Sequence, residues 1–166
     1  MGRWRPPAPK ASPYITPSGF ATLQAESKAL WLRRREVVKA LSESAAEGDR
    51  SENAEYIYRK KELAGLDRRI RYLQKRLPAL TVVRDRPKGD AIYFGAQVEL
   101  RDPTGAVSRY RLVGPDETDA RSSAISIDSP LARALLTKQV GDEVSVRTGD
   151  ATWMMTVVSI HYQLPG

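Results

Sequence analysis

The chain of 166 residues has no cysteine and a single histidine, His161. Without cysteine it has no disulfide framework, thiol nucleophile or zinc–thiolate site. The sequence indicates no catalytic partner for His161, so a structural or solvent-exposed histidine is favoured. A glycine-rich phosphate loop and a nucleophile beside a base are missing as well. These absences argue against a self-contained enzyme.

Long apolar runs are also missing. No stretch of about 18 apolar residues occurs, so we expect no membrane span. Residues 1–12 lack the apolar core of a signal peptide. They contain Arg3, Arg5 and Lys10 among several prolines, which predicts a disordered basic tail. Together these features are compatible with a cytoplasmic protein, which is the location we expect.

Helical periodicity is the main feature that the sequence does contain. From Phe20 to Ser44, positions recur at alternating spacings of three and four, and most of them are apolar, which predicts a helix. Thr16 and Pro17 suit its start, since threonine is a good N-cap and proline is tolerated at the first helical position. Three polar residues interrupt the seam: Ser27, Arg34 and Ser44.

A second helix is predicted downstream, because five apolar residues keep a strict heptad register: Leu63, Leu66, Ile70, Leu73 and Leu77. Gly48 suits the end of the first helix, and Pro78 disfavours continuation of the second. Each helix would have roughly 28 to 30 residues and a length of about 40–45 Å. Residues 13–79 are therefore expected to form an antiparallel coiled-coil stalk.

The turn between the helices, residues 47–56, is rich in carboxylates, and an antiparallel hairpin presents its turn at the end of the stalk. Asp49 and Glu52 have the spacing of a capping box, so they could simply close the second helix. They could instead be carboxylates delivered to a partner's site. The two interpretations are compatible, because a cap at an exposed tip remains chemically available.

Positive charge concentrates on the second helix. The net charge is +7, and residues 50–78 carry nine basic against four acidic groups. With Leu63 at heptad position a, the f positions form a basic column: Lys61, Arg68 and Lys75. Arg69 and Arg76 fall at g and Arg71 at b. Such a face could be merely solvated, or it could contact the backbone of RNA or DNA.

Residues 80–166 change toward the period of strands, which predicts an α+β domain with a small antiparallel sheet and one short helix. One hairpin joins Gln97–Leu100 to Val107–Val113 across the turn at 102–105, and a second joins residues 143–147 to 152–162. The helix would run from Ser129–Pro130 to about Leu136.

The last strand is expected to be covered on both sides, because it is apolar on both faces. One predicted face holds Met154, Thr156, Val158, Ile160 and Tyr162, and the other holds Trp153, Met155 and Val157.

Two stretches resemble one family. Residues 48–54, followed by Tyr56, Tyr58, Lys60-Lys61 and residues 67–73, closely resemble the Gre transcript cleavage factors of bacterial RNA polymerase, and the GreB branch in particular. Residues 125–136 and 140–142 resemble the signature of the C-terminal domain of that family. The resemblance runs from about Pro13 to Tyr162 and leaves the basic tail uninterpreted.

The resemblance implies a monomeric elongation factor whose coiled coil enters the polymerase secondary channel. An FKBP-like domain, residues 80–166, would dock at the channel rim through Ser129, Pro130 and Leu131. Asp49 and Glu52 would help to hold a weakly bound second Mg²⁺ in the polymerase active centre and orient the attacking water. Hydrolysis would then belong to the polymerase, and Mg²⁺ would not bind strongly to this protein alone.

Seven basic residues are expected to contact nucleic acid: Arg50, Lys60, Lys61, Arg68, Arg69, Arg71 and Lys75. Arg50 would contact phosphate, and the basic column of Lys61, Arg68 and Lys75 would face the extruded RNA 3′ end or the channel wall. Two alternatives remain. A channel-binding inhibitor would share the stalk but lack cleavage activity, although the presence of both Asp49 and Glu52 argues against it. A peptidyl-prolyl isomerase is suggested only by the FKBP-like fold, which is a poor guide to activity.

Overall fold

The computed structural model describes residues 10–46 and 54–163. They divide into two compact units. The helical unit is Ser18–Leu80, and the C-terminal unit joins the described residues up to Pro17 to those from Thr81 onward. The stalk was expected to begin at residue 13, whereas the structure groups the chain through Pro17 with the C-terminal unit.

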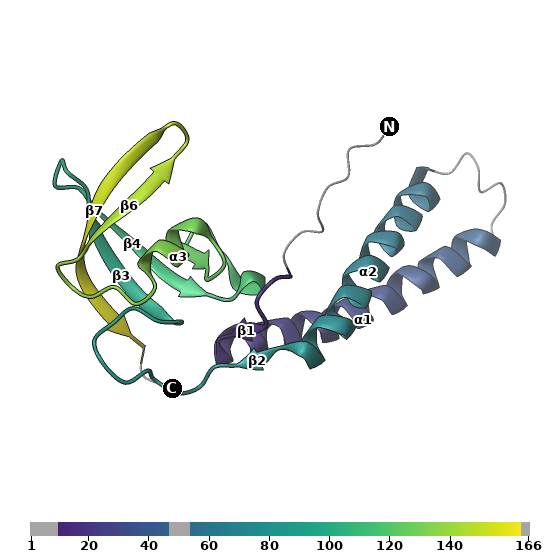
Figure 1. Ribbon diagram of the computed structural model, residues 1–166. Helices are drawn as coiled ribbons and strands as arrows, with labels where there is room; N and C mark the ends of the chain where they lie inside the picture. The colour runs from purple at the N-terminus through teal and green to yellow at the C-terminus, as the bar shows by residue number, and fades with distance from the viewer. Residues whose placement is uncertain (1–9, 47–53, 164–166) are drawn as a thin grey trace, which may run out of the picture. The chain divides into compact units, whose positions relative to one another are not determined.

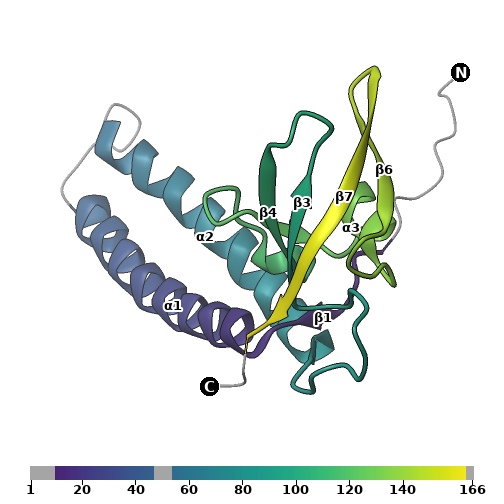
Figure 2. The ribbon, with the colours of Figure 1, turned by 90° about the vertical axis from the view of Figure 1, so that its left-hand side faces the viewer.

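The helical unit consists of two long antiparallel helices, α1 (Pro17–Ala46) and α2 (Ala54–Ala79), which lie side by side (Figures 1 and 2). Leu23 and Val37 of α1 are buried, as are Ile70 and Leu73 of α2. These are seam positions of the heptad pattern, and their burial supplies the apolar contact that holds the pair together. The predicted helical hairpin is confirmed.

The second helix ends directly after Pro78, in keeping with the sequence. α2 includes Pro78 and ends at Ala79. A proline so close to the C-terminus removes a single helical hydrogen bond. The Leu80 amide then donates to the Leu77 carbonyl at 3.3 Å, a short-range bond of the kind that often closes a last turn.

The C-terminal unit contains a five-stranded sheet in the order β5-β4-β3-β7-β6, and Figure 2 shows β4, β3, β7 and β6 in that sequence. The strands are β3 (Ala96–Arg101), β4 (Val107–Val113), β5 (Ala124–Ser126), β6 (Glu143–Thr148) and β7 (Ala151–Tyr162). Both predicted hairpins are present. In the first, the Asp102 carboxylate accepts hydrogen bonds from the Thr104 and Ala106 amides, at 2.8 and 3.0 Å.

The sheet is mixed rather than antiparallel throughout. β5 pairs with β4 in parallel, with Leu112 opposite Ile125. The chain reaches β5 through a short 3-10 helix, η1 (Pro115–Glu117), and a turn at residues 119–124. Three residues are too few to display a strand period, so the sequence pattern did not indicate β5.

A β-bulge in β7 overturns the predicted division of its faces. Glu99 pairs with Ser159 but the next residue, Leu100, pairs with Val157, so Val158 is the extra residue. A bulge shifts the alternation of side chains by one position. Residues on both sides of it consequently pack against the same core: Met155, Val157, Ile160 and Tyr162. Nor is the whole strand covered, because Trp153 and Met154 are 43% and 47% exposed.

The core of this unit lies between the sheet and α3 (Pro130–Leu135). Ser129 caps α3 as predicted, accepting a hydrogen bond from the Ala132 amide at 3.2 Å. Ala132 and Leu135 are fully buried against the sheet. Their main buried partners on the sheet are Ala96, Val98, Leu100, Leu112, Val144 and Val157.

The N-terminal segment is built into the C-terminal unit. β1 (Tyr14–Ile15) pairs in parallel with β2 (Thr81–Val82), and Ile15 is fully buried. Ser12 donates to the Asp128 carboxylate from its backbone amide, at 2.8 Å, and from its hydroxyl. Ser12, which was predicted to belong to a disordered tail, is therefore held in place. Residues 1–9 of that predicted tail lie outside the described residues.

The Glu117 carboxylate fastens the end of this segment. It accepts hydrogen bonds from the Thr16 amide at 2.8 Å, from the Thr16 hydroxyl and from the Gly114 amide at 2.9 Å. Thr16 is buried, so its polar groups need such partners inside the protein. The segment that precedes α1 is thereby held within the C-terminal unit.

Candidate functional site

The candidate site is the stalk and its tip. Asp49, Arg50 and Glu52 lie outside the described residues, so their positions and roles stay predictions. The structure describes the helices on either side of them, up to Ala46 of α1 and from Ala54 of α2. Glu55, in the first turn of α2, accepts a hydrogen bond from Arg59 at 3.1 Å.

Ion pairs join the two helices along the stalk. Arg34 of α1 meets Asp67 of α2 at 2.7 Å, and Arg69 of α2 meets Glu26 of α1 through two bonds of 2.8 and 2.9 Å. Surface ion pairs add little stability, but pairs of defined length between two helices favour one register over its neighbours.

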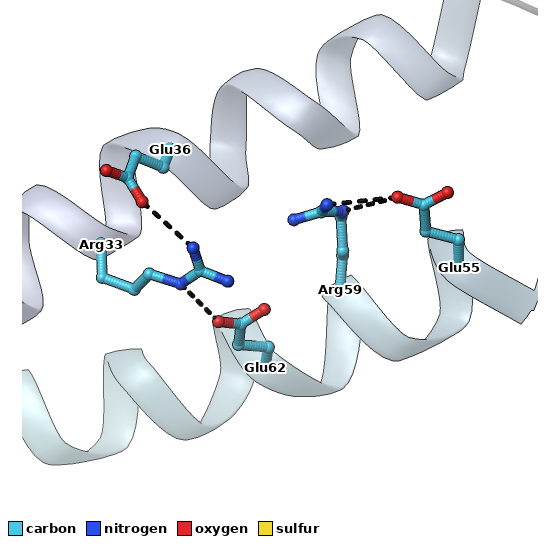
Figure 3. A network of polar contacts seen from close by, with 5 residues as sticks. All are labelled: Arg33, Glu36, Glu55, Arg59 and Glu62. Atoms are coloured by element: carbon cyan, nitrogen blue, oxygen red, sulfur yellow. Dashed lines mark hydrogen bonds and ion pairs between the residues drawn. The ribbon is translucent and has the colours of Figure 1, made fainter.

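A third interhelical pair forms a small network. Arg33 of α1 donates to Glu62 of α2 at 2.7 Å and to Glu36 of its own helix at 3.0 Å (Figure 3). The hydrogen bonds to Glu62 and then Glu36 raise the pKa of the Arg33 guanidinium above its ordinary value. The arginine therefore remains a fixed cation between the two carboxylates.

Six of the seven basic residues predicted for nucleic-acid contact are described by the structure, and they fall into two groups. Lys60 and Arg69 are engaged within the stalk: the Lys60 ammonium lies 5.0 Å from the Tyr56 ring centre, and Arg69 binds Glu26 and lies 5.2 Å from the Tyr72 ring centre. The others are exposed and form no ion pair with any described residue: Lys61, Arg68, Arg71 and Lys75.

The three residues expected to dock on a partner have local roles in the C-terminal unit. Ser129 caps α3, Pro130 is its exposed first residue, and Leu131 is half-buried against the core. Of these, Pro130 offers the most open surface. Docking by this segment stays a prediction.

A cavity of about 240 Å³ lies beside strands β3, β4 and β7. His161 lines it, and none of the residues predicted for polymerase, metal or nucleic-acid contact does. Its polar lining comes mainly from these side chains: Gln97, Glu99, Arg109, Arg111, Ser122 and His161.

Sequence reasoning missed the interhelical ion pairs and the aromatic side chains exposed on the stalk. Tyr58 is 68% exposed and Tyr72 is 42% exposed. The signal was available for the tyrosines, because both occupy heptad position c, on the outside of a coiled coil. For the ion pairs no such signal existed, since the relative register of the two helices was unknown.

Comparison with known proteins identifies the family. The model for "Transcription elongation factor, N-terminal" matches residues 13–82, and that for "Transcription elongation factor, GreA/GreB, C-term" matches residues 86–162. The chain belongs to the GreA/GreB family of transcription elongation factors. The two matches correspond to the helical hairpin with its flanking strands and to the five-stranded sheet with α3.

The similar proteins of this family carry the name of the GreB branch. Transcription elongation factor GreB of Xanthomonas axonopodis pv. citri is 59% identical over 165 residues, which is 98% of each chain. Transcription elongation factor GreB of Pseudomonas aeruginosa is 55% identical over 166 residues, again 98% of each. This GreA/GreB family member therefore falls in the GreB branch.

Solved structures of related factors were also compared. The transcription factor Gfh1 is 29% identical, with a TM-score of 0.44 over 92% of this chain and 99% of that one. A GreA/GreB elongation factor of Nitrosomonas europaea is 21% identical, with a TM-score of 0.41 over 91% and 100% of the two chains.

Along the described chain, no helix is both long and apolar enough to cross a bilayer.

Proposed function

We propose that this elongation factor acts in the cytoplasm, inserts its helical hairpin into the secondary channel of RNA polymerase and stimulates endonucleolytic cleavage of the nascent RNA 3′ end in backtracked complexes. The observation that carries the proposal is the pair of carboxylates, Asp49 and Glu52, in the connection between the two long helices of a GreB-branch chain. The polymerase would supply the remaining groups of the reaction.

The tip carboxylates are suited to this role by their chemistry. Carboxylate oxygens are ligands that Mg²⁺ accepts, and protein sites commonly hold that ion with one or two carboxylates plus water and substrate phosphate. A second Mg²⁺, held jointly with the polymerase, would stabilise charge on the oxygens of the phosphodiester. Asp49 and Glu52 would position that ion and the water beside the RNA. Two carboxylates alone make a poor Mg²⁺ site, so the isolated chain would cut no RNA.

The length and rigidity of the stalk would position the tip carboxylates relative to the RNA. α2 has 26 residues, which corresponds to about 39 Å at 1.5 Å per residue. Interhelical pairs such as Arg34–Asp67 and Arg69–Glu26 keep the helices in register. A rigid stalk matters because displacement of a reacting group by about 1 Å can cost on the order of a hundredfold in rate. The C-terminal unit would dock at the channel rim around Ser129, Pro130 and Leu131.

The test uses a stalled, backtracked elongation complex and sizes the RNA that the full chain releases at several Mg²⁺ concentrations. Asp49→Asn and Glu52→Gln should each lower the rate by roughly 10- to 100-fold or more, because loss even of a residue that supports a metal ligand costs this much. Binding to polymerase should persist, since the change removes no docking area.

Glu43→Gln is the matched control. Glu43 is an exposed carboxylate on the same hairpin, near the end of α1, and its loss should leave the cleavage rate unchanged. Equal rates for wild type and both tip variants would leave Asp49 and Glu52 with a capping role alone. Binding by the wild type that blocks transcription without releasing RNA would overturn the cleavage function itself.

A further inference from the structure

The face of the sheet that turns away from α3 is polar where β4, β3 and β7 lie side by side (Figure 2). Side chains alternate between the two faces of a strand, and Ala96, Val98 and Leu100 of β3 pack in the core with α3. Gln97 and Glu99 therefore point to the opposite face. Because both line the cavity of about 240 Å³ described above, that cavity lies on this polar face.

Two rows of side chains cross the strands at the cavity. Gln97 of β3 is paired with Arg111 of β4 on one side and with His161 of β7 on the other. Glu99 is paired with Arg109 in the next row. Residues paired in this way share a face of the sheet. Neighbouring strands are about 4.8 Å apart, so Arg111, Gln97 and His161 begin within about 10 Å of one another.

Arg111 is a half-buried cation without a counter-ion in the described chain. Its Nε atom is buried and has no hydrogen-bond partner among the described residues. Its guanidinium also forms no ion pair with any of them. Buried polar atoms are almost always hydrogen-bonded, and a charge removed from water is normally paired. An acceptor that carries negative charge is therefore the group that would complete this site.

The charges around Arg111 favour a ligand with a single negative charge. Arg109, the other cation in the lining, binds Glu99 at 2.9 Å, so these two charges offset each other. The Asp119 carboxylate accepts a hydrogen bond from the Ser122 hydroxyl at 3.0 Å, and Ser122 lines the cavity. Arg111 is thus the one uncompensated cation of the described lining. A dianion such as phosphate would be repelled by the two nearby carboxylates.

Neutral hydrogen-bond donors lie beside this cation. Gln97 and His161 line the cavity, and their side chains form no hydrogen bond with a described residue. The glutamine amide donates through its NH₂ group, and a neutral imidazole donates through one ring nitrogen. The guanidinium of Arg111 can bind a carboxylate through two parallel hydrogen bonds. These three side chains together suit carboxylate oxygens.

We propose that this cavity binds a small polar monocarboxylate, with the carboxylate on the Arg111 guanidinium and the other polar atoms on Gln97 and His161. Its volume of about 240 Å³ is below the range of about 300–1,000 Å³ that is typical of sites for drug-sized ligands. A molecule of a few heavy atoms therefore fits. This inference does not depend on the proposed function, because no residue assigned to polymerase, metal or nucleic-acid contact lines the cavity.

The test titrates sodium lactate, a monocarboxylate with one hydroxyl group, into the full chain at constant ionic strength. Heteronuclear NMR resolves the Nε–H signals of arginine side chains, and the Arg111 signal should shift on binding. A ligand of this size should bind with a Kd on the order of 1 mM. Propylene glycol, which has a hydroxymethyl group in place of the carboxylate, and inorganic phosphate should each bind at least about tenfold more weakly.

Gln97→Glu is the main variant, because it places a carboxylate opposite Arg111 within the chain itself. Gln97 is exposed, so the change should leave the fold intact. The new carboxylate should occupy the guanidinium, shift the Arg111 Nε–H signal without ligand and weaken lactate binding by at least about tenfold. Arg111→Lys keeps the charge but loses the planar guanidinium, and should weaken lactate binding as well.

Arg101→Gln is the matched control. Arg101 is an exposed arginine of β3 that does not line the cavity, so this variant should bind lactate as the wild type does. Equal lactate binding by wild type and Gln97→Glu would overturn the site. An Arg111 signal that does not move at about 50 mM lactate would overturn it too. Phosphate binding as tight as lactate binding would overturn the assignment to a monocarboxylate.

Discussion

The backbone at Gly114 runs so close to the N-terminal segment that only glycine fits. A Cβ at this position would lie 2.0 Å from the Tyr14 carbonyl oxygen, far inside any real contact distance. The Gly114 φ angle is −70°, which any residue adopts, so the requirement comes from space and not from backbone conformation. Tyr14 belongs to β1, and the Gly114 amide shares the Glu117 carboxylate with Thr16.

Gly114→Ala should therefore destabilise the C-terminal unit. The added methyl group must push β1 away, and crowding of this kind typically costs about 1–3 kcal/mol. Urea unfolding followed by tryptophan fluorescence measures the loss, since Trp153 lies on β7 of the same unit.

Gly65→Ala provides the matched control for this change. Gly65 lies within α2, and its added Cβ would meet nothing closer than 3.8 Å. Alanine in the interior of a helix should raise stability by about 0.5–1 kcal/mol over glycine. If Gly114→Ala unfolds at the same urea concentration as wild type, the N-terminal segment is not held as closely as described.

Among the helices and strands, sequence periodicity predicted the features that recur along an element, such as a heptad seam. It did not predict a local irregularity such as a β-bulge. The strict register from Leu63 to Leu77 predicted α2 and its seam, and Ile70 and Leu73 are indeed buried. The bulge at Val158 was not predictable, because one inserted residue leaves the apolar content of β7 unchanged while reversing its faces.

The charged residues of the stalk were likewise predicted only in part from the sequence. Heptad counting placed Lys61, Arg68 and Lys75 on the exposed side, where the structure has them. It could not assign Arg69 to an ion pair, because its partner Glu26 is 43 positions away and belongs to the other helix. Contacts between two helices depend on how the helices align along each other, and the heptad pattern of one helix does not determine that alignment.

The Arg34–Asp67 pair offers a test of this register. Arg34→Asp should place two carboxylates opposite each other and lower stability, and the double variant Arg34→Asp with Asp67→Arg should recover most of the loss. The recovered coupling should be between about 0.2 and 1 kcal/mol, as for other half-exposed pairs. A double-mutant cycle on urea unfolding, monitored by helical circular dichroism, measures it. Additive effects would mean that the two side chains do not interact in solution.

At the scale of the whole molecule, the C-terminal unit is discontinuous in sequence. Removal of residues 1–16 should destabilise the C-terminal unit. It deletes β1, leaves β2 unpaired and removes the Thr16 groups that donate to the Glu117 carboxylate. The buried Ile15 alone accounts for about 1.5–3 kcal/mol of lost burial. Removal of residues 1–9 is the control and should leave stability unchanged. Equal thermal unfolding midpoints for the two truncations would contradict the anchoring.

The bond between Ser12 and Asp128 joins residues 116 positions apart, and this separation has a consequence for synthesis on the ribosome. The N-terminal segment from Ser12 to Thr16 leaves the exit tunnel early, but its partners in β2, η1 and the loop before α3 emerge much later. The helical hairpin needs only local contacts, which form fastest. When the hairpin has formed, the start of α1 and the end of α2 lie near each other. The loop between Ile15 and Val82 is then effectively much shorter than its 67 positions. The entropy cost of closing this loop falls accordingly. Formation of the hairpin would thus favour the pairing of β1 with β2, and a nascent chain with a disrupted seam would pair these two strands more slowly.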